Sequence, residues 1–447
     1  MSKLIFHLKK LFSIFASILK TPHFGFVQGH HYIDNKGISE LYQIVGADDE
    51  EIILKFEQSF SNLIGSGSSV SFASGRMGFY VLMKACGIGR GDEVIINGAT
   101  CSVMINAILR CNAIPVYSDI DPNTFGSSAQ SIQKCLSERV KMVVAQHSFG
   151  IPCEINLIAD ICRDANIFLL EDCALALGST LNNINVGTFG DAALFSTDRS
   201  KPLNTIIGGL IYTNKTSIFK KLRKVQSQSS NLSIEKQKMI WSRFLLERKF
   251  AQPGRYRLLQ FFDFISQVKR RLISGISPFL DEDFGSKIVP GSYPYPSRLP
   301  AFLAAIGILE INRWSSIKKD RERMLSHYTE WVKNHNFNIQ LPSVYYDSHR
   351  NITPLRIVWS QENGELIRQQ LESVINISWI WFKQPIITTF EPLENFSYKH
   401  GGCPISEHIG IGMVNLPTSV SYEDFLMLLE MVSLVLNNRK LQDMVSK

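Results

Sequence analysis

The sequence lacks any run that could span a membrane, since no segment approaches the roughly 18 or more consecutive apolar residues that a transmembrane helix needs. It also lacks a strong charge imbalance: 47 Lys+Arg against 40 Asp+Glu give a net charge of +7. No basic motif interleaved with aromatic residues accompanies this excess, so no nucleic-acid partner is expected. Internal repeats and low-complexity segments are missing too. The 447 residues therefore predict an ordinary globular protein of about two or three domains.

Paired cysteine motifs are also missing. None of the eight cysteines forms a C-x-x-C pair, and most lie in apolar segments where a reduced thiol packs as a small hydrophobic group. A disulfide scaffold is therefore disfavoured, and a reducing, cytoplasmic location is expected. Cys101, Cys173 and His147 could in principle form a thiol or metal site, but their spacing does not match a zinc site. No metal is predicted.

The N-terminal segment, residues 1–30, carries a basic amphipathic pattern. It lacks an A-x-A-like cleavage site after its short apolar core, so a signal peptide is disfavoured. Apolar residues recur among lysines at helical spacing: Leu4, Leu8, Leu11, Phe12, Phe15, Ile18 and Leu19. This pattern suits a helix lying on a membrane surface and suits equally a helix docked on the body of the protein. Both alternatives stay open.

Strand-like and helix-like segments alternate within residues 31–214, which we predict to form the large domain. The strand-like segments are apolar almost throughout: 92–97, 114–121, 140–149, 166–174, 193–198 and 208–214. Such strands, separated by helices near 128–138 and 154–165, indicate a mostly parallel sheet sandwiched between helices. The predicted fold class is α/β, with ligands expected beyond the carboxyl ends of the strands.

The remaining chain divides into two predicted parts. Residues 215–290 are basic and show few strand signals, which predicts a mostly helical insertion. Its surface is either a solvated charged face on packed helices or a face that contacts anionic lipid. Residues 291–447 are predicted to form a small α/β domain. It would begin with a helix near residue 300, contain strands at 353–360 and 377–382, and end in an amphipathic helix.

Polar residues gather where the predicted strands stop. Asp172 ends an apolar strand, where a carboxylate is costly unless it meets a cation. Ser196 ends the next strand, and Lys201 follows in a short polar turn. Gly75 lies in a strand-to-helix turn whose free backbone amides can hold a phosphate. Together these groups can hold pyridoxal 5'-phosphate (PLP), with the lysine on its aldehyde and the carboxylate on its pyridine nitrogen.

The order of these segments resembles the DegT-type (DegT/DnrJ/StrS) nucleotide-sugar aminotransferases, which are fold-type I PLP enzymes of polysaccharide and antibiotic-sugar pathways. The resemblance runs from about residue 65 to about residue 435, outside the basic insertion. Its motifs occur in family order: SGRMGFYVLMKACGIGRGDEVI, NAIPVYSDIDPNTF, QHSFGIP, LLEDCALALGS, VGTFGDAALFSTDRSKPL, GGLIYTN, LPAFLAAIGILEINRW and CPISEHIGIGMVNLPT.

The resemblance implies roles for the residues at the strand ends. Lys201 matches the family's Schiff-base lysine, Asp172 the partner of the pyridinium nitrogen, and Ser196 a phosphate ligand. Gly75 and Arg76 occupy the phosphate-binding turn. Arg76 replaces a small hydroxyl residue often found there, and it could pair with the phosphate by charge.

Two further residues match the family less closely. His147 stands where the family commonly has a histidine, and a catalytic role and a satisfied core position are equally open for it. Arg298 matches the arginine of the N-x-R motif with which a partner subunit completes the active site, although Pro296 replaces the asparagine. The resemblance therefore implies a homodimer with shared active sites.

Two contacts to the cofactor ring also depart from the family pattern. Leu175 stands where glutamine or histidine usually contacts the ring. No aromatic residue occurs at 99–101, where one usually stacks on the ring; the residues there are Ala99, Thr100 and Cys101. These losses are expected to weaken cofactor binding.

The resemblance implies a PLP-dependent aminotransferase that converts a nucleotide-linked keto-sugar to an amino sugar, with glutamate as the expected amino donor. Lys201 would hold the cofactor and then serve as general base and acid. A dehydratase branch of the family lacks this lysine, so Lys201 argues against that branch. The alternative is a catalytically weakened member that acts as a binding or scaffold subunit of a surface-polysaccharide assembly, in contact with the membrane.

Overall fold

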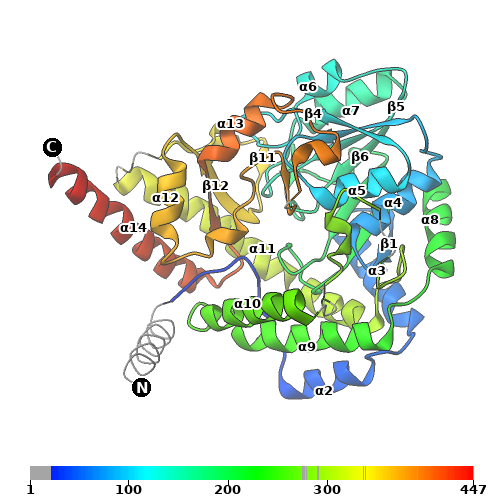
Figure 1. Cartoon of the computed structure of the whole chain (residues 1–447), viewed down its shortest axis with the longest axis horizontal. Coiled ribbons are helices and arrows are strands. Elements are labelled where there is room, and N and C mark those ends of the chain that lie inside the picture. The colour runs from blue at the N-terminus through cyan, green and yellow to red at the C-terminus, as the bar shows by residue number, and fades with distance from the viewer. Residues whose placement is uncertain are drawn as a thin grey trace.

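The computed structural model describes residues 22–273, 277, 279–288, 291–335, 337, 339–389 and 391–445. Most of the N-terminal segment predicted to be an amphipathic helix lies outside the described residues. From residue 22 the chain is largely extended, and Phe24 and Phe26 are buried. In Figure 1 a large body built around the main sheet lies beside a smaller body that carries the C-terminal helix.

The main sheet has seven strands in the order β1-β10-β9-β6-β5-β2-β4. Within it β10 runs antiparallel to both neighbours, and the other neighbouring strands pair in parallel. This arrangement confirms the predicted α/β fold class. The strands are β1 (Ser68–Phe72), β2 (Glu93–Asn97), β4 (Ile114–Ser118), β5 (Val140–Gln146), β6 (Phe168–Asp172), β9 (Ala192–Ser196) and β10 (Gly209–Thr213).

Helices cover both faces of this sheet, because its strands are apolar on both sides. On one face Val143 and Leu169 belong to an apolar cluster shared with α6 (Ala129–Lys134) and α7 (Ile155–Asp164). The larger cluster on the opposite face includes side chains from α3 (Glu50–Ile64), α4 (Gly75–Ala85), α5 (Ser102–Arg110) and α8 (Thr216–Gln228). The carboxyl ends of the parallel strands are thereby left at one edge, where the predicted ligand residues lie.

The segment predicted as a basic insertion contains α8, α9 (Ile234–Phe250) and α10 (Tyr256–Ile273). Trp241 and Phe244 of α9 are buried in the large apolar cluster. Figure 1 shows α9 and α10 side by side below the sheet. Phe264 and Ile265 of α10 are exposed, and contact of this segment with lipid stays a prediction. Among the described residues no helix is long and apolar enough to cross a bilayer.

The small domain is built on β12 (Arg356–Ser360), which pairs antiparallel with β14 (Met413–Pro417). Helix α11 (Ala301–His335) runs from the large apolar cluster at Ile306 to the small-domain cluster at Tyr328. The other helices are α2 (Asn35–Gln43), α12 (Gly364–Leu371), α13 (Pro404–Gly412) and α14 (Tyr422–Val445).

The strand predicted at 377–382 is wrong. Residues Ile377–Trp379 form a short 3-10 turn, capped by the Asn376 side chain, which accepts a hydrogen bond from the Ser378 amide. Two backbone groups that would pair with a neighbouring strand are instead hydrogen-bonded to side chains. Arg356 donates to the Trp379 carbonyl, and Asn415 accepts from the Trp381 amide. The apolar residues of this stretch therefore form a loop and not a strand.

That loop leads back to the large domain. Residues Ile386–Ile387 form β13, which pairs in parallel with β3 (Thr100–Cys101). Since residues 99–101 follow β2 at the carboxyl edge of the main sheet, this pairing holds the 379–388 loop over the edge where the polar residues gather.

Candidate cofactor site at the carboxyl edge of the sheet

Asp172 lies at the carboxyl end of β6, between Gln146 of β5 and Leu194 of β9. Its side chain is buried, and its Oδ1 accepts a hydrogen bond from the Ala174 amide at 3.0 Å. Burial raises the pKa of Asp172, while that hydrogen bond and the positive charge of Lys201 act in the opposite direction. The Ala174 amide and the positive charge of Lys201 thus offset part of the cost of burying this carboxylate at the end of an apolar strand.

Lys201 lies in the loop that connects β9 to β10. Backbone hydrogen bonds fix this loop: the Lys201 amide donates to Asp198 at 2.9 Å, and the Thr197 amide donates to Gly208 at 3.0 Å. Burial lowers the pKa of Lys201, and the negative charges of Asp198 and Asp172 oppose this shift. A lower pKa increases the neutral fraction of the amine, which is the form that attacks an aldehyde.

Gly75 and Ser196 lie together at the same edge. Gly75 is the first residue of α4, and a Cβ atom built on it would be 3.7 Å from Cβ of Ser196. A Cβ on Gly209 of β10 would be only 2.3 Å from the Gly75 nitrogen, so the start of α4 is pressed against the sheet. Free amides at a helix start beside a hydroxyl suit a phosphate group.

Arg76 is held by the insertion. Its Nε donates to Oδ2 of Asp283 at 2.8 Å, and its Nη2 donates to the Leu280 carbonyl. Asp283 also pairs with Arg110 at 2.9 Å and accepts from the Tyr293 hydroxyl at 3.1 Å. In this arrangement the guanidinium of Arg76 pairs with a carboxylate of the chain, where the sequence suggested the cofactor phosphate.

We expect Asp283→Ala to lower the free energy of unfolding by about 3–5 kcal/mol, because it leaves two mostly buried arginines without a counter-charge. The side chains of Arg76 and Arg110 are only 11% and 13% exposed. The control is Asp160→Ala, which removes an exposed pair with Arg163 and should cost well under about 1 kcal/mol. Urea unfolding of both variants checks this, and equal midpoints would contradict it.

His147 is a hydrogen-bonded core residue. Its Nδ1 accepts from the Cys153 amide at 3.1 Å, so its Nε2 carries the proton that faces Glu171, also at 3.1 Å. Oxygens of Glu171 accept further from the amides of Gly187, Phe189 and Gly190. The geometry favours the satisfied core position over a catalytic one, because both ring nitrogens have partners inside the fold.

The same cluster has the composition of a metal site, since one ligand atom each of His147, Glu171 and Cys173 lies within 4.8 Å of the others. Its hydrogen bonds argue for a structural role instead. Glu171 is fully buried, and its carboxylate already accepts hydrogen bonds from three backbone amides and from His147. The bonds to the amides hold the 187–190 turn in place. We assign no metal to it.

The side chain of Arg298 is paired with carboxylates of its own chain. It pairs with Glu50 and, at 3.4 Å, with Asp48, both at the start of α3. Its amide donates to the Ser230 carbonyl at 3.1 Å. Completion of a partner subunit's active site by Arg298 therefore stays a prediction.

An aromatic residue that the sequence did not single out reaches Lys201. The ring centroid of Trp381, in the small-domain loop, is 5.5 Å from Nζ of Lys201. The sequence has no aromatic residue at 99–101, and the β3–β13 pairing brings this loop over that position. The tryptophans of ISWIWF are the sequence signal for it, although the pattern of this stretch predicts a strand. Leu175 is buried, as an apolar residue at that place should be.

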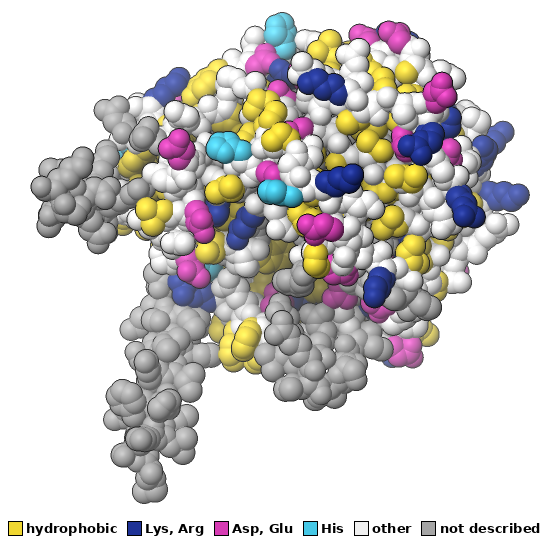
Figure 2. Space-filling model, turned by 45° about the horizontal axis from the view of Figure 1, so that its top comes forward, with side chains coloured by type: hydrophobic (Ala, Val, Ile, Leu, Met, Phe, Trp, Pro, Cys, Tyr) yellow, Lys and Arg dark blue, Asp and Glu magenta, His cyan; other side chains and the backbone are white. Residues whose placement is uncertain are grey.

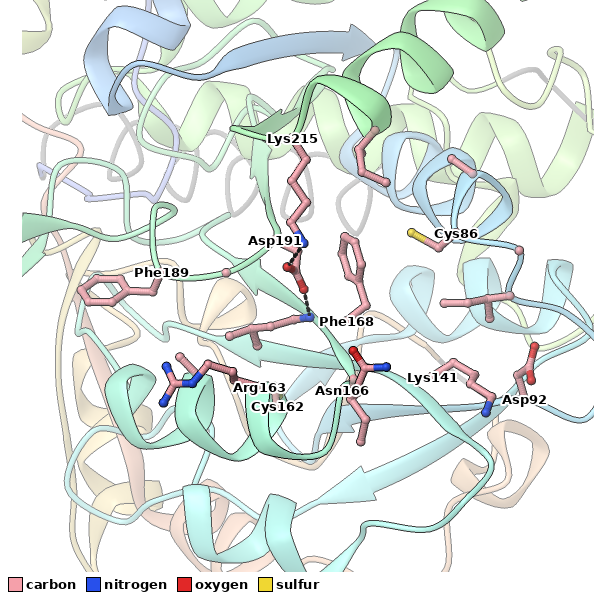
Figure 3. A pocket seen from close by; sticks show the side chains of 18 of the residues that line it. Cys86, Asp92, Lys141, Cys162, Arg163, Asn166, Phe168, Phe189, Asp191 and Lys215 are labelled. Carbon is pink, nitrogen blue, oxygen red and sulfur yellow. Dashed lines mark hydrogen bonds and ion pairs between the residues drawn. The ribbon is translucent and has the colours of Figure 1, made fainter.

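A cavity of about 730 Å³ lies at the other edge of the sheet, far along the strands from Lys201 (Figure 3). It is lined by residues at the amino ends of β5 and β6, including Lys141 and Phe168. Lys215 pairs there with Asp191, whose other oxygen accepts from the Leu169 amide at 2.7 Å. The cavity contains none of the predicted ligand residues, so we do not place the cofactor in it.

This sheet order, with a lysine and an aspartate at its carboxyl edge, defines a fold-type I PLP enzyme. The chain belongs to the DegT/DnrJ/EryC1/StrS aminotransferase family, whose model matches residues 47–425. The aminotransferase from Psychrobacter cryohalolentis has the same fold, with a TM-score of 0.67 over 91% of this chain and 97% of that chain, at 16% sequence identity.

Curated relatives match over shorter stretches. GDP-perosamine synthase of Vibrio cholerae is 31% identical over 174 residues, 39% of this chain and 47% of that protein. L-glutamine:2-deoxy-scyllo-inosose aminotransferase of Streptomyces fradiae is 30% identical over 188 residues, 42% of this chain and 44% of that protein. The matches thus span about half the length of these relatives.

PLP is the cofactor of this class, and the residues at the carboxyl edge fit it. Asp172 is buried and Lys201 half-buried at one edge of the sheet, as the pyridine nitrogen and the aldehyde require. Gly75 and Ser196 lie together at a helix start, as the phosphate requires. Nε1 of Trp381, beside Lys201, is a buried donor without an acceptor inside the protein. A donor of this kind is expected where a bound molecule supplies the acceptor.

Proposed function

We propose that this protein is a PLP-dependent aminotransferase that converts a nucleotide-linked keto-sugar to an amino sugar. The observation that carries the proposal is the position of Lys201 and Asp172. Asp172 is buried and Lys201 is half-buried at the carboxyl edge of one sheet, in a chain of the aminotransferase family. A lysine in a polar turn is ordinarily exposed, and this one is not, which calls for a chemical reason.

Each residue at the carboxyl edge has a separate role in the proposed reaction. When bound, PLP supplies an electron sink for the carbon that loses its proton. Asp172 would keep a proton on the pyridine nitrogen, and the Ala174 amide holds its carboxylate in position. The start of α4 and the hydroxyl of Ser196 would hold the phosphate. Lys201 would hold the cofactor aldehyde through its amine, and the same amine, when free, would serve as the general base and acid.

The names of the relatives support the substrate class. One makes GDP-perosamine, an amino sugar on a nucleotide, and the other aminates a deoxy-inosose with L-glutamine. Glutamate and glutamine share an α-amino group and an α-carboxylate, so the donor proposed here, glutamate, belongs to the same chemical class. Action in the cytoplasm and in surface-polysaccharide synthesis, and a homodimer with shared sites, are parts of the same proposal.

The half-reaction tests this function directly. The protein loaded with PLP is mixed with glutamate, and loss of the visible cofactor band should accompany one equivalent of 2-oxoglutarate. A panel of nucleotide-linked keto-sugars is then added, and mass spectrometry should find the keto oxygen replaced by an amino group. Free PLP with glutamate serves as the control.

The scaffold alternative makes a different prediction. Pro296 and Leu175 favour it, because each replaces a polar residue that usually contacts the cofactor or the partner's site. The scaffold function is favoured, and the aminotransferase proposal is wrong, if the protein binds PLP no better than its Lys201→Ala variant and releases no 2-oxo acid from any donor.

A further inference from the structure

Helix α10 presents an apolar face to its surroundings. On its inner side Tyr256 and Leu259 are buried, in a small apolar cluster with Val27. Within residues 256–266 the exposed side chains are all apolar, and they form what we call the outer face: Phe261, Phe262, Phe264 and Ile265. Their spacing places them on one side of an α-helix. A contiguous exposed apolar surface of this kind marks a site of interaction.

The inner side of α10 is tied to the loop that carries Lys201. Asp263 precedes Phe264 and forms an ion pair with Arg243 of α9. Oδ2 of Asp263 also lies 3.8 Å from Nη2 of Arg199, which is two residues before Lys201 in the β9–β10 loop. These charge contacts turn Asp263 toward the protein, so the neighbouring Phe264 faces outward.

The described part of the chain begins beside the same helix. The His23 amide donates to the Pro253 carbonyl at 2.9 Å, and the ring centroids of His23 and Tyr256 are 6.3 Å apart. Residues 1–21 precede this point and lie outside the described residues, and their sequence carries four lysines among regularly spaced apolar residues. A basic and apolar segment is therefore attached to the body of the protein at the start of α10.

The sequence around the outer face is basic. Lys249 near the end of α9 and Arg255 before α10 are exposed, and a further KRR sequence follows at 269–271. Asp263 is the single acidic residue within residues 248–271, and it faces α9. An apolar face flanked by basic residues is typical of helices that lie in the interface of a bilayer with anionic lipid.

We propose that the outer face of α10 docks on the surface of a bilayer that contains anionic lipid. The four apolar side chains enter the boundary between headgroups and acyl chains, and the flanking lysines and arginines attract the anionic headgroups. This inference goes beyond the proposed function and does not depend on it. Because α10 contacts the Lys201 loop, docking brings the candidate cofactor site close to the membrane surface.

Two other occupants fit the outer face less well. A second copy of the chain would set two basic surfaces against each other, and four half-exposed side chains fall well short of the roughly 800 Å² per partner that a standard interface buries. Residues 1–21 are basic as well, so their charges would be repelled by the basic surroundings of α10. Anionic lipid carries the complementary charge for both segments.

Sedimentation of the full chain with vesicles of phosphatidylcholine and phosphatidylglycerol in equal amounts tests the proposal. The double variant Phe264→Ser with Ile265→Ser should lower the partition coefficient at least about tenfold, because two apolar side chains no longer enter the bilayer. Phe262 is left in place, since its ring packs on Phe250 with centroids 5.4 Å apart. Added salt should weaken binding of the wild type, because it screens the attraction to the headgroups.

The control is the double variant Leu157→Ser with Ile184→Ser. These two residues are 55% and 49% exposed, which matches the 62% and 44% of Phe264 and Ile265. Leu157 belongs to α7, which covers the opposite face of the sheet from α9, and Ile184 belongs to β8 (Ile184–Asn185). The control should bind vesicles as the wild type does, and both double variants should keep the wild-type melting temperature, because they change exposed side chains.

The outcomes separate docking from its alternatives. Absence of wild-type binding, or equal binding by the α10 variant and the control, would overturn the proposal. A dimer that dissociates in the α10 variant, measured by light scattering without vesicles, would overturn it in favour of a second copy. Stronger vesicle binding after deletion of residues 1–21 would also overturn it, because it would show that this segment covers the outer face. The glutamate half-reaction without vesicles should proceed normally in the α10 variant, so each proposal can fail alone.

Discussion

Lys201→Ala is expected to lower the rate of the glutamate half-reaction by a factor of about 10⁴ or more, since it removes both the covalent anchor of PLP and the group that moves the proton. The visible absorption band of the lysine-bound cofactor should disappear, and PLP should be released on dialysis. Lys201 lies in a loop fixed by backbone hydrogen bonds, which the substitution leaves in place, so the fold should survive. Circular dichroism with absorption spectroscopy measures both effects.

Lys215→Ala is the matched control for this prediction. Lys215 follows the strand that comes after the Lys201 loop, and its amine pairs with Asp191 at the opposite edge of the sheet (Figure 3). This variant should keep the cofactor band and the half-reaction. If Lys201→Ala retained the band, or if both variants lost it equally, the assignment of Lys201 as the cofactor lysine would be wrong.

Glu247→Ala is expected to lower the free energy of unfolding by about 3 kcal/mol, because it leaves two buried arginines with only the partly exposed Asp263 as a counter-charge. Glu247 of α9 is fully buried and pairs with Arg199 at 2.8 Å and with Arg243 at 2.7 Å. Arg199 belongs to the same loop as Lys201, and its guanidinium lies 5.0 Å from the Trp379 ring. Loss of Glu247 should therefore also loosen the Lys201 loop and weaken the retention of PLP.

The control is Glu40→Ala, which removes an exposed pair with Lys36 and should change stability by less than about 1 kcal/mol. Urea unfolding with and without PLP measures both. Equal urea midpoints for Glu247→Ala and Glu40→Ala would show that the insertion does not support the Lys201 loop.

The pH dependence of stability gives a second check on Glu247. Burial raises its pKa, but the charges of Arg199 and Arg243 outweigh that effect and hold it below its ordinary value. The pair thus stabilises the fold fully above the unfolded-state pKa of about 4.3, and this contribution is lost as the pH falls through the lower folded-state pKa. The Glu247→Ala variant should lack this part of the acid transition.

The distribution of charged side chains on the surface tests the predicted contact with anionic lipid. Figure 2 shows basic and acidic side chains interspersed over the visible face, without a patch of one sign. This face gives no electrostatic support for anionic lipid as a partner. Phe264 and Ile265 of α10 are exposed apolar residues of the basic insertion, and contact of this segment with lipid stays a prediction.

Much of the cofactor site could be predicted because its residues follow strand ends. Asp172, Ser196 and Gly75 occupy the last or first position of a regular element, and parallel strands bring such positions to one edge. The sequence predicts the turn in which Arg76 lies, but not the partner of its side chain. Asp283 lies 207 residues away in sequence, and no local pattern joins them.

The sequence by itself determined the alternation of strands and helices in the large domain, the burial of the sheet on both faces, and the lysine and aspartate at its carboxyl edge. Each of these depends on hydrophobic periodicity or on position at the end of an element, which are local properties. Tertiary structure alone decided that Glu171 accepts hydrogen bonds from backbone amides and that Glu247 pairs with Arg199 of the Lys201 loop. It also decided that Arg356, Asn415 and Trp381 meet beside Lys201. These contacts join segments far apart in the chain, and their energies arise from charges and hydrogen bonds that are buried only once the domains have packed.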